Sequence, residues 1–132
     1  MTDLAPIALF CYNRDDHLHR VLEALATNAE FRKTRLYIFS DGPKDEKDQA
    51  KVKAVRQTLT SRKWTSRQHL YLRNKNLGLA RSVIQGVSNV LNKHKTVIVL
   101  EDDLVVSANF LAYANESLRL YKKEEKVISV MG

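Results

Sequence analysis

Three adjacent carboxylates, Glu101, Asp102 and Asp103 (the acidic triplet), directly follow the apolar run Val97–Leu100. Such a run is typical of a strand buried on both faces, as in a parallel sheet covered by helices. Neighbouring carboxylates repel one another, so the triplet favours a cation, and oxygen ligands suit a hard divalent ion. Ligands of open α/β sheets bind beyond the carboxyl ends of such strands. A solvated acidic turn is the alternative, because a short motif alone does not exclude it.

Apolar runs of strand length alternate with segments of helical periodicity along the chain. Strands are predicted at Ile7–Tyr12, Leu36–Ser40, His69–Leu72, Thr96–Leu100 and Val127–Met131. Helices are predicted around Leu18–Leu25, at Lys44–Thr60, at Gly78–Leu91 and after an N-cap at Ser107. This alternation predicts βαβ units with a mostly parallel sheet, in a Rossmann-like three-layer α/β/α fold. We expect residues 1–132 to form one domain and to be part of a longer one.

Two predicted helices have apolar faces that should pack on the sheet. The third helix presents Ala80, Val83, Ile84, Val87 and Leu91, and the fourth presents Phe110, Ala114, Leu118 and Tyr121. Trp64 lies in a basic loop before the third strand. A hydrophobic anchor for the loop is the favoured interpretation of this residue, and stacking on a base is the alternative.

Polar residues follow four of the predicted strands. They are Asn13-Arg14, Ser40-Asp41-Gly42, Arg73–Asn76 and the acidic triplet. Because the carboxyl ends of parallel strands meet at one edge of the sheet, these groups should surround one site. A divalent ion there would neutralise charge on the diphosphate of a nucleotide sugar. Asp41 is suited to accept a base N–H, and Arg14 and Arg81 are suited to phosphates or the base.

The ordered set Pro6–Arg14, Ser40–Gly42, Asn76–Arg81 and Val99–Asp103 resembles the nucleotide-sugar-binding half of GT-A glycosyltransferases. It is most similar to the family-2-like and N-acetylglucosaminyltransferase I-like group, in which Glu-Asp-Asp is a variant of the Asp-X-Asp motif. The resemblance implies a GT-A nucleotide-diphospho-sugar transferase fold, a nucleoside-diphosphate sugar as donor (UDP-sugar by default) and Mn²⁺ or Mg²⁺ as cofactor.

The resemblance also implies roles for individual residues. Asp103 would ligate the metal, Glu101 and Asp102 would contact the ribose or donor sugar, and Asp41 would recognise uracil. The nucleotide pocket would be completed by Tyr12, Asn13, Arg14 and Arg81. In this group the acceptor site and the general base of an inverting hexosyl transfer follow the fifth strand. We therefore expect that base beyond Gly132, so this stretch alone would bind a donor without transferring it, and the acceptor (glycan, lipid or protein) stays open.

The charge distribution supports one competing interpretation. The chain carries a net charge of +7, and residues 31–75 hold thirteen Lys and Arg against four acids. A basic segment of this kind is typical of binding to nucleic acid or other anions, which is the alternative function. It does not account for the acidic triplet, so no nucleic acid partner is expected.

Localisation and assembly are predicted from simpler features. The single Cys11 cannot form an internal disulfide, and the first residues do not resemble a signal peptide. We expect a cytoplasmic protein, with peripheral membrane association left open. A free sheet edge also favours pairing with a second copy of the chain.

Overall fold

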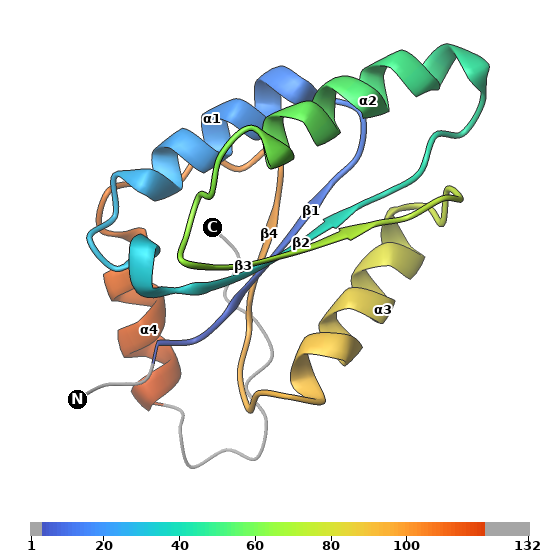
Figure 1. Ribbon diagram of the computed structural model, residues 1–132. Helices are drawn as coiled ribbons and strands as arrows, with labels where there is room; N and C mark the ends of the chain where they lie inside the picture. Colours follow the sequence, from blue (N-terminus) through green and yellow to red (C-terminus); the bar gives the residue numbers. More distant parts are fainter. Residues whose placement is uncertain (1–3, 121–132) are drawn as a thin grey trace.

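A computed structural model describes residues 4–120 of the chain (Figure 1). Its strands are β1 (Ile7–Cys11), β2 (Arg35–Ser40), β3 (Arg67–Leu72) and β4 (Ile98–Glu101). Its helices are α1 (Asp15–Ala26), α2 (Glu46–Thr60), α3 (Leu79–Leu91) and α4 (Phe110–Leu120), with a 3₁₀ turn, η1 (Phe31–Lys33), before β2. The predicted strand Val127–Met131 and Tyr121 lie outside the described residues. None of the helices within 4–120 is long and apolar enough to span a bilayer.

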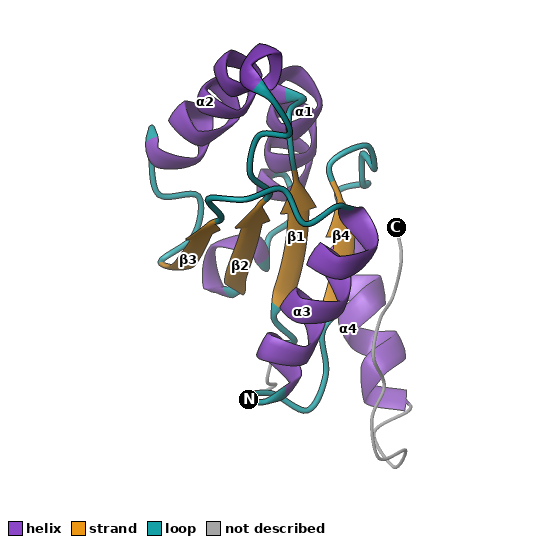
Figure 2. Cartoon of the chain, turned by 90° about the vertical axis from the view of Figure 1, so that its right-hand side faces the viewer, coloured by secondary structure: helices purple, strands orange, loops and turns teal. Residues whose placement is uncertain are grey.

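The four strands form one parallel sheet in the order β3-β2-β1-β4. In the register, Leu9 of β1 pairs with Ile38 on one side and Leu100 on the other. Figure 2 shows the strands running in the same direction, so their carboxyl ends meet at one edge. The predicted α/β Rossmann-like fold with a parallel sheet is therefore confirmed.

Successive residues of the central strand β1 contribute to two different cores, because side chains alternate across a sheet. Ile7, Leu9 and Cys11 pack with α1, α2 and α4. Ala8 and Phe10 pack with α3 on the opposite face. Figure 1 shows α1 and α2 on one side of the sheet and α3 on the other. Both faces of β1 are thus buried, as its continuous apolar sequence predicts.

The packing face of α3 differs from the predicted one. Ala80 and Ile84 are exposed, and the residues that face the sheet form a row that includes Gly86 and Val90. A Cβ atom at position 86 would lie 2.5 Å from Cε1 of Phe10, so only glycine allows this close approach. The helix turns its small residues toward the sheet because the aromatic rings there already fill the space. The larger predicted residues flank the contact, half-buried: Val83, Val87 and Leu91.

The amino end of α4 is capped by a residue from another part of the chain. The helix begins at Phe110, and the backbone N–H of Leu111 donates to Oδ1 of Asn28 at 2.9 Å. Nδ2 of Asn28 donates to the carbonyl of Ser107 at 3.0 Å. The predicted cap at Ser107 is therefore wrong, because a buried asparagine far earlier in the chain satisfies this helix end.

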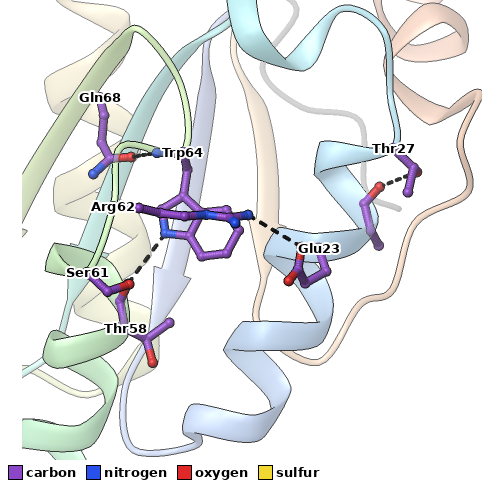
Figure 3. A network of polar contacts seen from close by, with 8 residues as sticks. Glu23, Thr27, Thr58, Ser61, Arg62, Trp64 and Gln68 are labelled. Carbon is purple, nitrogen blue, oxygen red and sulfur yellow. Dashed lines mark hydrogen bonds and ion pairs between the residues drawn. The ribbon is translucent and has the colours of Figure 1, made fainter.

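Trp64 anchors the loop before β3, as expected, and Figure 3 shows the Arg62 side chain lying across its ring. The residue is only 6% exposed, and its Nε1 donates to the carbonyl of Thr58 at 3.5 Å. The guanidinium of Arg62 stacks over the ring at 3.6 Å from the centroid and lies 3.4 Å from the carboxylate of Glu23. This loop therefore ties α2 to α1 near the amino end of β3.

Candidate functional site

A pocket of about 500 Å³ opens at the carboxyl ends of the strands. It is lined by residues that follow β1, β2 and β4 and by the connection from β3 to α3. Seven of the eight predicted site residues line it: Tyr12, Asn13, Arg14, Asp41, Glu101, Asp102 and Asp103. A smaller hollow of about 370 Å³ lies along α2, and none of the predicted residues lines it.

Arg81 is the predicted site residue that does not line the pocket. It is exposed on α3, whereas its neighbour Ser82 is buried and reaches the pocket wall. Consecutive helical residues point in directions about 100° apart, so a helix that turns Ser82 inward turns Arg81 away. The pocket also contains Asn76, which belongs to one of the predicted strand-end groups. The remaining lining residues had no predicted role: Phe10, Cys11, Lys44, Gly78, Leu79 and Ser82.

The acidic triplet forms one end of this lining. Glu101 is the last residue of β4 and is paired with Phe10 of β1, while Asp103 is exposed in the turn that follows. Among the described residues, no side-chain hydrogen bond or ion pair reaches the carboxylate of Glu101 or of Asp103. Their oxygens are therefore available to a ligand, and oxygen donors suit Mg²⁺ or Mn²⁺.

The environment of Asp102 is less favourable for a charged carboxylate than water is. Burial raises the pKa of this carboxyl, and the negative charge of Asp103 raises it further. The charges of Arg14 and His17 and a hydrogen bond from the Tyr12 backbone act in the opposite direction. The net pKa is raised, because the loss of hydration on burial outweighs these favourable interactions.

Asp41 is engaged differently, because four protein donors surround its buried carboxylate. Oδ1 accepts from the N–H of Gly42 at 2.9 Å and of Leu77 at 2.8 Å. Oδ2 accepts from the N–H of Gly78 at 3.0 Å and from Nδ2 of Asn76 at 3.3 Å. Since each carboxylate oxygen offers about two acceptor positions, a base contact through Asp41 requires one of these donors to give way.

Two glycines allow this loop arrangement. A Cβ atom on Gly42 would lie 2.6 Å from the backbone carbon of Lys75, so the turn after β2 touches the turn after β3. Gly78 has a φ of +83° at the start of α3, a backbone conformation that residues with a Cβ atom rarely adopt. Together they bring the β3–α3 connection against the end of β2, where Asp41 holds it.

Asp48 is a buried residue near the pocket that the sequence interpretation missed. It lies in the first turn of α2, and its N–H donates to the N-cap Asp45. Its carboxylate accepts from the hydroxyl of Tyr12, from Nδ2 of Asn13 at 2.8 Å and from the N–H of Lys44 at 3.1 Å. The one sequence signal was an acid three residues after a capping Asp, and this signal indicates only a helix start.

Arg56 of α2 joins the carboxyl ends of two strands. Its guanidinium donates to the carbonyls of Asp41 at 3.3 Å and Arg73 at 2.6 Å, and to the hydroxyl of Ser40 at 3.1 Å. Arg73 in turn donates to Ser82 at 3.1 Å. Part of the positive charge of segment 31–75 therefore serves the internal structure of this edge.

The residues present fit a divalent ion shared with a ligand. Within residues 4–120, no group of three or more His, Cys, Asp or Glu side chains is arranged to enclose a metal alone. Mg²⁺ commonly binds through one or two carboxylates together with substrate phosphates. An open carboxylate such as Asp103 beside a pocket is consistent with that kind of site.

Comparison with known families identifies the domain. No curated protein matches the chain at a significant level. The profile of glycosyl transferase family 2 matches residues 7–124, which include every described strand and the whole pocket lining. A domain of this family implies a nucleotide-sugar donor and an acceptor. With its parallel α/β sheet and a match over most of its length, the chain belongs to glycosyl transferase family 2.

Proposed function

We propose that this domain binds a nucleoside-diphosphate sugar, by default a UDP-sugar, in the pocket at the carboxyl ends of β1, β2 and β4. The donor would be held together with Mn²⁺ or Mg²⁺ at Glu101–Asp103 and its sugar transferred with inversion to an acceptor. The observation that carries the proposal is the convergence on one pocket of seven predicted residues from three separate segments of the chain. Membership of family 2 supports the reaction class, and the closer likeness to the N-acetylglucosaminyltransferase I-like group stays a prediction.

The chemistry of the acidic triplet supports a metal-bound diphosphate. Asp103 is the proposed metal ligand, because it is exposed and no described side chain pairs with it. When bound, the divalent ion would stabilise negative charge on the departing diphosphate. Glu101 and Asp102 are proposed to contact the ribose or sugar, since Glu101 also lacks a partner among the described side chains.

The remaining lining residues would bind and orient the nucleotide. Arg14 is exposed at the pocket rim, where its charge suits phosphate oxygens. Phe10 and Leu79 contribute apolar surface, which suits a base or the sugar carbons. Uracil recognition by Asp41 is also part of the proposal, although the carboxylate would have to exchange a protein donor for the base N–H.

Calorimetric titration of the 132-residue chain with UDP tests this proposal. We expect binding in the presence of Mn²⁺ that weakens by at least about tenfold when the ion is removed with a chelator, because carboxylates and phosphates repel each other without it. Absence of binding to UDP, GDP, CDP and ADP, with and without metal, would contradict the proposal. Tight, steeply salt-dependent binding to RNA or DNA without a nucleotide response would instead favour the basic-segment alternative.

A further inference from the structure

The hydrogen bonds of Asp48 connect a helix end that does not line the pocket to residues that do. Asp48 is 8% exposed and absent from the lining, whereas Tyr12, Asn13 and Lys44 all line it. Three donors from these residues converge on the one carboxylate. A single buried group thus contacts three residues of the pocket wall.

The ionisation of Asp48 suits it to this task. Burial by itself would raise the pKa of the carboxyl, but the hydrogen bonds from Tyr12, Asn13 and Lys44 and the charge of Lys51 hold it below its ordinary value. The group therefore stays an anion, which accepts hydrogen bonds and cannot donate one. Bonds to a charged acceptor are also stronger than those between neutral groups.

These contacts determine what Tyr12 and Asn13 can offer a ligand. Because Nδ2 of Asn13 donates to Asp48, the Oδ1 atom of the same amide remains an acceptor for another partner. The hydroxyl proton of Tyr12 is likewise committed to Asp48, which leaves the partly exposed ring as its contribution to the pocket. An aromatic face and an amide oxygen suit the face and the N–H edge of a nucleobase.

We infer that Asp48 is a positioning residue of the nucleotide site, which fixes the Tyr12 ring and the Asn13 amide in the orientation that a nucleoside diphosphate requires. This inference rests on the proposed function. It assigns Asp48 no contact with the ligand, and it makes the pocket wall preformed, so that little ordering is needed when the nucleotide binds.

The test compares Asp48→Asn with Asp45→Asn, a matched change at the same helix end. Asparagine is as good an N-cap as aspartate, and Asp45 does not line the pocket, so D45N should bind UDP like the wild type. In D48N the charged acceptor is lost, and we expect UDP affinity to fall about tenfold. The gain in UDP affinity on adding Mn²⁺ should stay unchanged in D48N, which general loss of structure would not allow.

Two spectroscopic signals report the positioning contacts directly. Desolvation and the hydrogen bond to Asp48 raise the pKa of Tyr12 to about 12. In D48N this pKa should fall toward 10.0, as followed by NMR titration of the tyrosine rings and assigned with Tyr12→Phe. The side-chain amide protons of Asn13 should exchange slowly with water in the wild type and faster in D48N.

The outcomes separate the inference from the proposed function. A folded D48N chain with a lowered Tyr12 pKa and unchanged UDP affinity would overturn the positioning role. If D48N does not fold, Y12F decides, because it keeps the ring and removes one contact; unchanged UDP affinity in that variant also counts against the role. If the wild type binds no nucleoside diphosphate, the proposed function fails. Fast exchange of the Asn13 side-chain amide protons in the wild type would separately refute the fixed orientation of that amide.

Discussion

Two groups of carboxylates lie at or beside the pocket, and they are used in opposite ways. On the β2 and α2 side, Asp41 and Asp48 are buried, and seven hydrogen bonds reach their carboxylates from other residues. On the β4 side, Glu101 and Asp103 accept no side-chain hydrogen bond from the described residues. A carboxylate whose acceptor positions are filled by protein donors maintains the pocket, whereas one without partners is available to a ligand.

The extent to which each carboxylate is buried agrees with this division between protein-bonded and unpartnered carboxylates. A buried charge is tolerated only when hydrogen bonds replace its lost hydration, and Asp41 and Asp48 have those bonds. Asp103 is exposed and remains hydrated without a protein partner among the described side chains. Asp102 is the intermediate case, since burial raises its pKa and only part of that cost is offset.

The largest expected effect is on the ligand side. Asp103→Asn should remove the Mn²⁺ dependence of UDP binding, because the change replaces the proposed charged metal ligand with a weaker neutral one. We expect the metal-dependent gain in affinity, about tenfold or more, to disappear, as measured by calorimetry with and without Mn²⁺. D45N serves as the control and should retain the gain. An undiminished response to Mn²⁺ in D103N would show that Asp103 is not the ligand.

The next effect lies on the structural side, where Asp41→Asn replaces one carboxylate oxygen with an N–H₂ group that cannot accept a hydrogen bond. The backbone N–H groups of Leu77 and Gly78 bond to different oxygens of Asp41, so one of them faces a donor whichever way the new amide turns. We expect a loss of about 2 kcal/mol in the free energy of unfolding, because a buried donor is left without an acceptor. Urea denaturation measures this loss.

D103N is the matched control for this stability effect, since it makes the same chemical change at an exposed position. Its free energy of unfolding should stay within about 0.5 kcal/mol of the wild type. Equal destabilisation by D41N and D103N would break the distinction between the two groups of carboxylates.

The third prediction concerns acid and Asp48. Because the pKa of this carboxyl is lowered from 3.8 on folding, its contribution to stability is present above pH 3.8. The contribution is lost as the pH falls through the lower pKa of the folded state, since the unfolded chain binds the proton first. The difference in unfolding free energy between wild type and D48N should therefore be constant near neutral pH and shrink below pH 3.8. A difference that grows on acidification would contradict the assignment.

The smallest expected effect is at Asp102, and it has the opposite sign. A raised pKa means that the charged form is less stable in the folded protein than in water, so charge at Asp102 lowers stability at neutral pH. D102N should raise the midpoint of thermal unfolding slightly at pH 7 without ligand. The gain should vanish at acid pH, where the wild-type carboxyl is protonated. A lower midpoint at pH 7 would show that the Asp102 carboxylate stabilises the fold, as those of Asp41 and Asp48 are expected to do.

Local patterns in the sequence were enough to predict the order of strands and helices and the edge of the sheet at which the polar residues gather. Apolar runs such as Ile7–Cys11 predict buried parallel strands, and parallel strands bring their carboxyl ends together. The position of the acidic triplet follows from the same pattern, because its strand and its turn are adjacent in the chain. These features need only the periodicity of side chains along a strand or a helix.

Which side chains are already engaged depends on long-range contacts that appear only in the folded chain. Asp41 binds the turn at Asn76–Gly78, Asp48 binds the end of β1, and Asn28 caps α4, each between residues far apart in the sequence. The close approach of Gly86 to Phe10 likewise sets the packing face of α3. Hydrogen bonds and van der Waals contacts depend on distances in space, and residue type does not reveal which distant partner fills an acceptor or a gap.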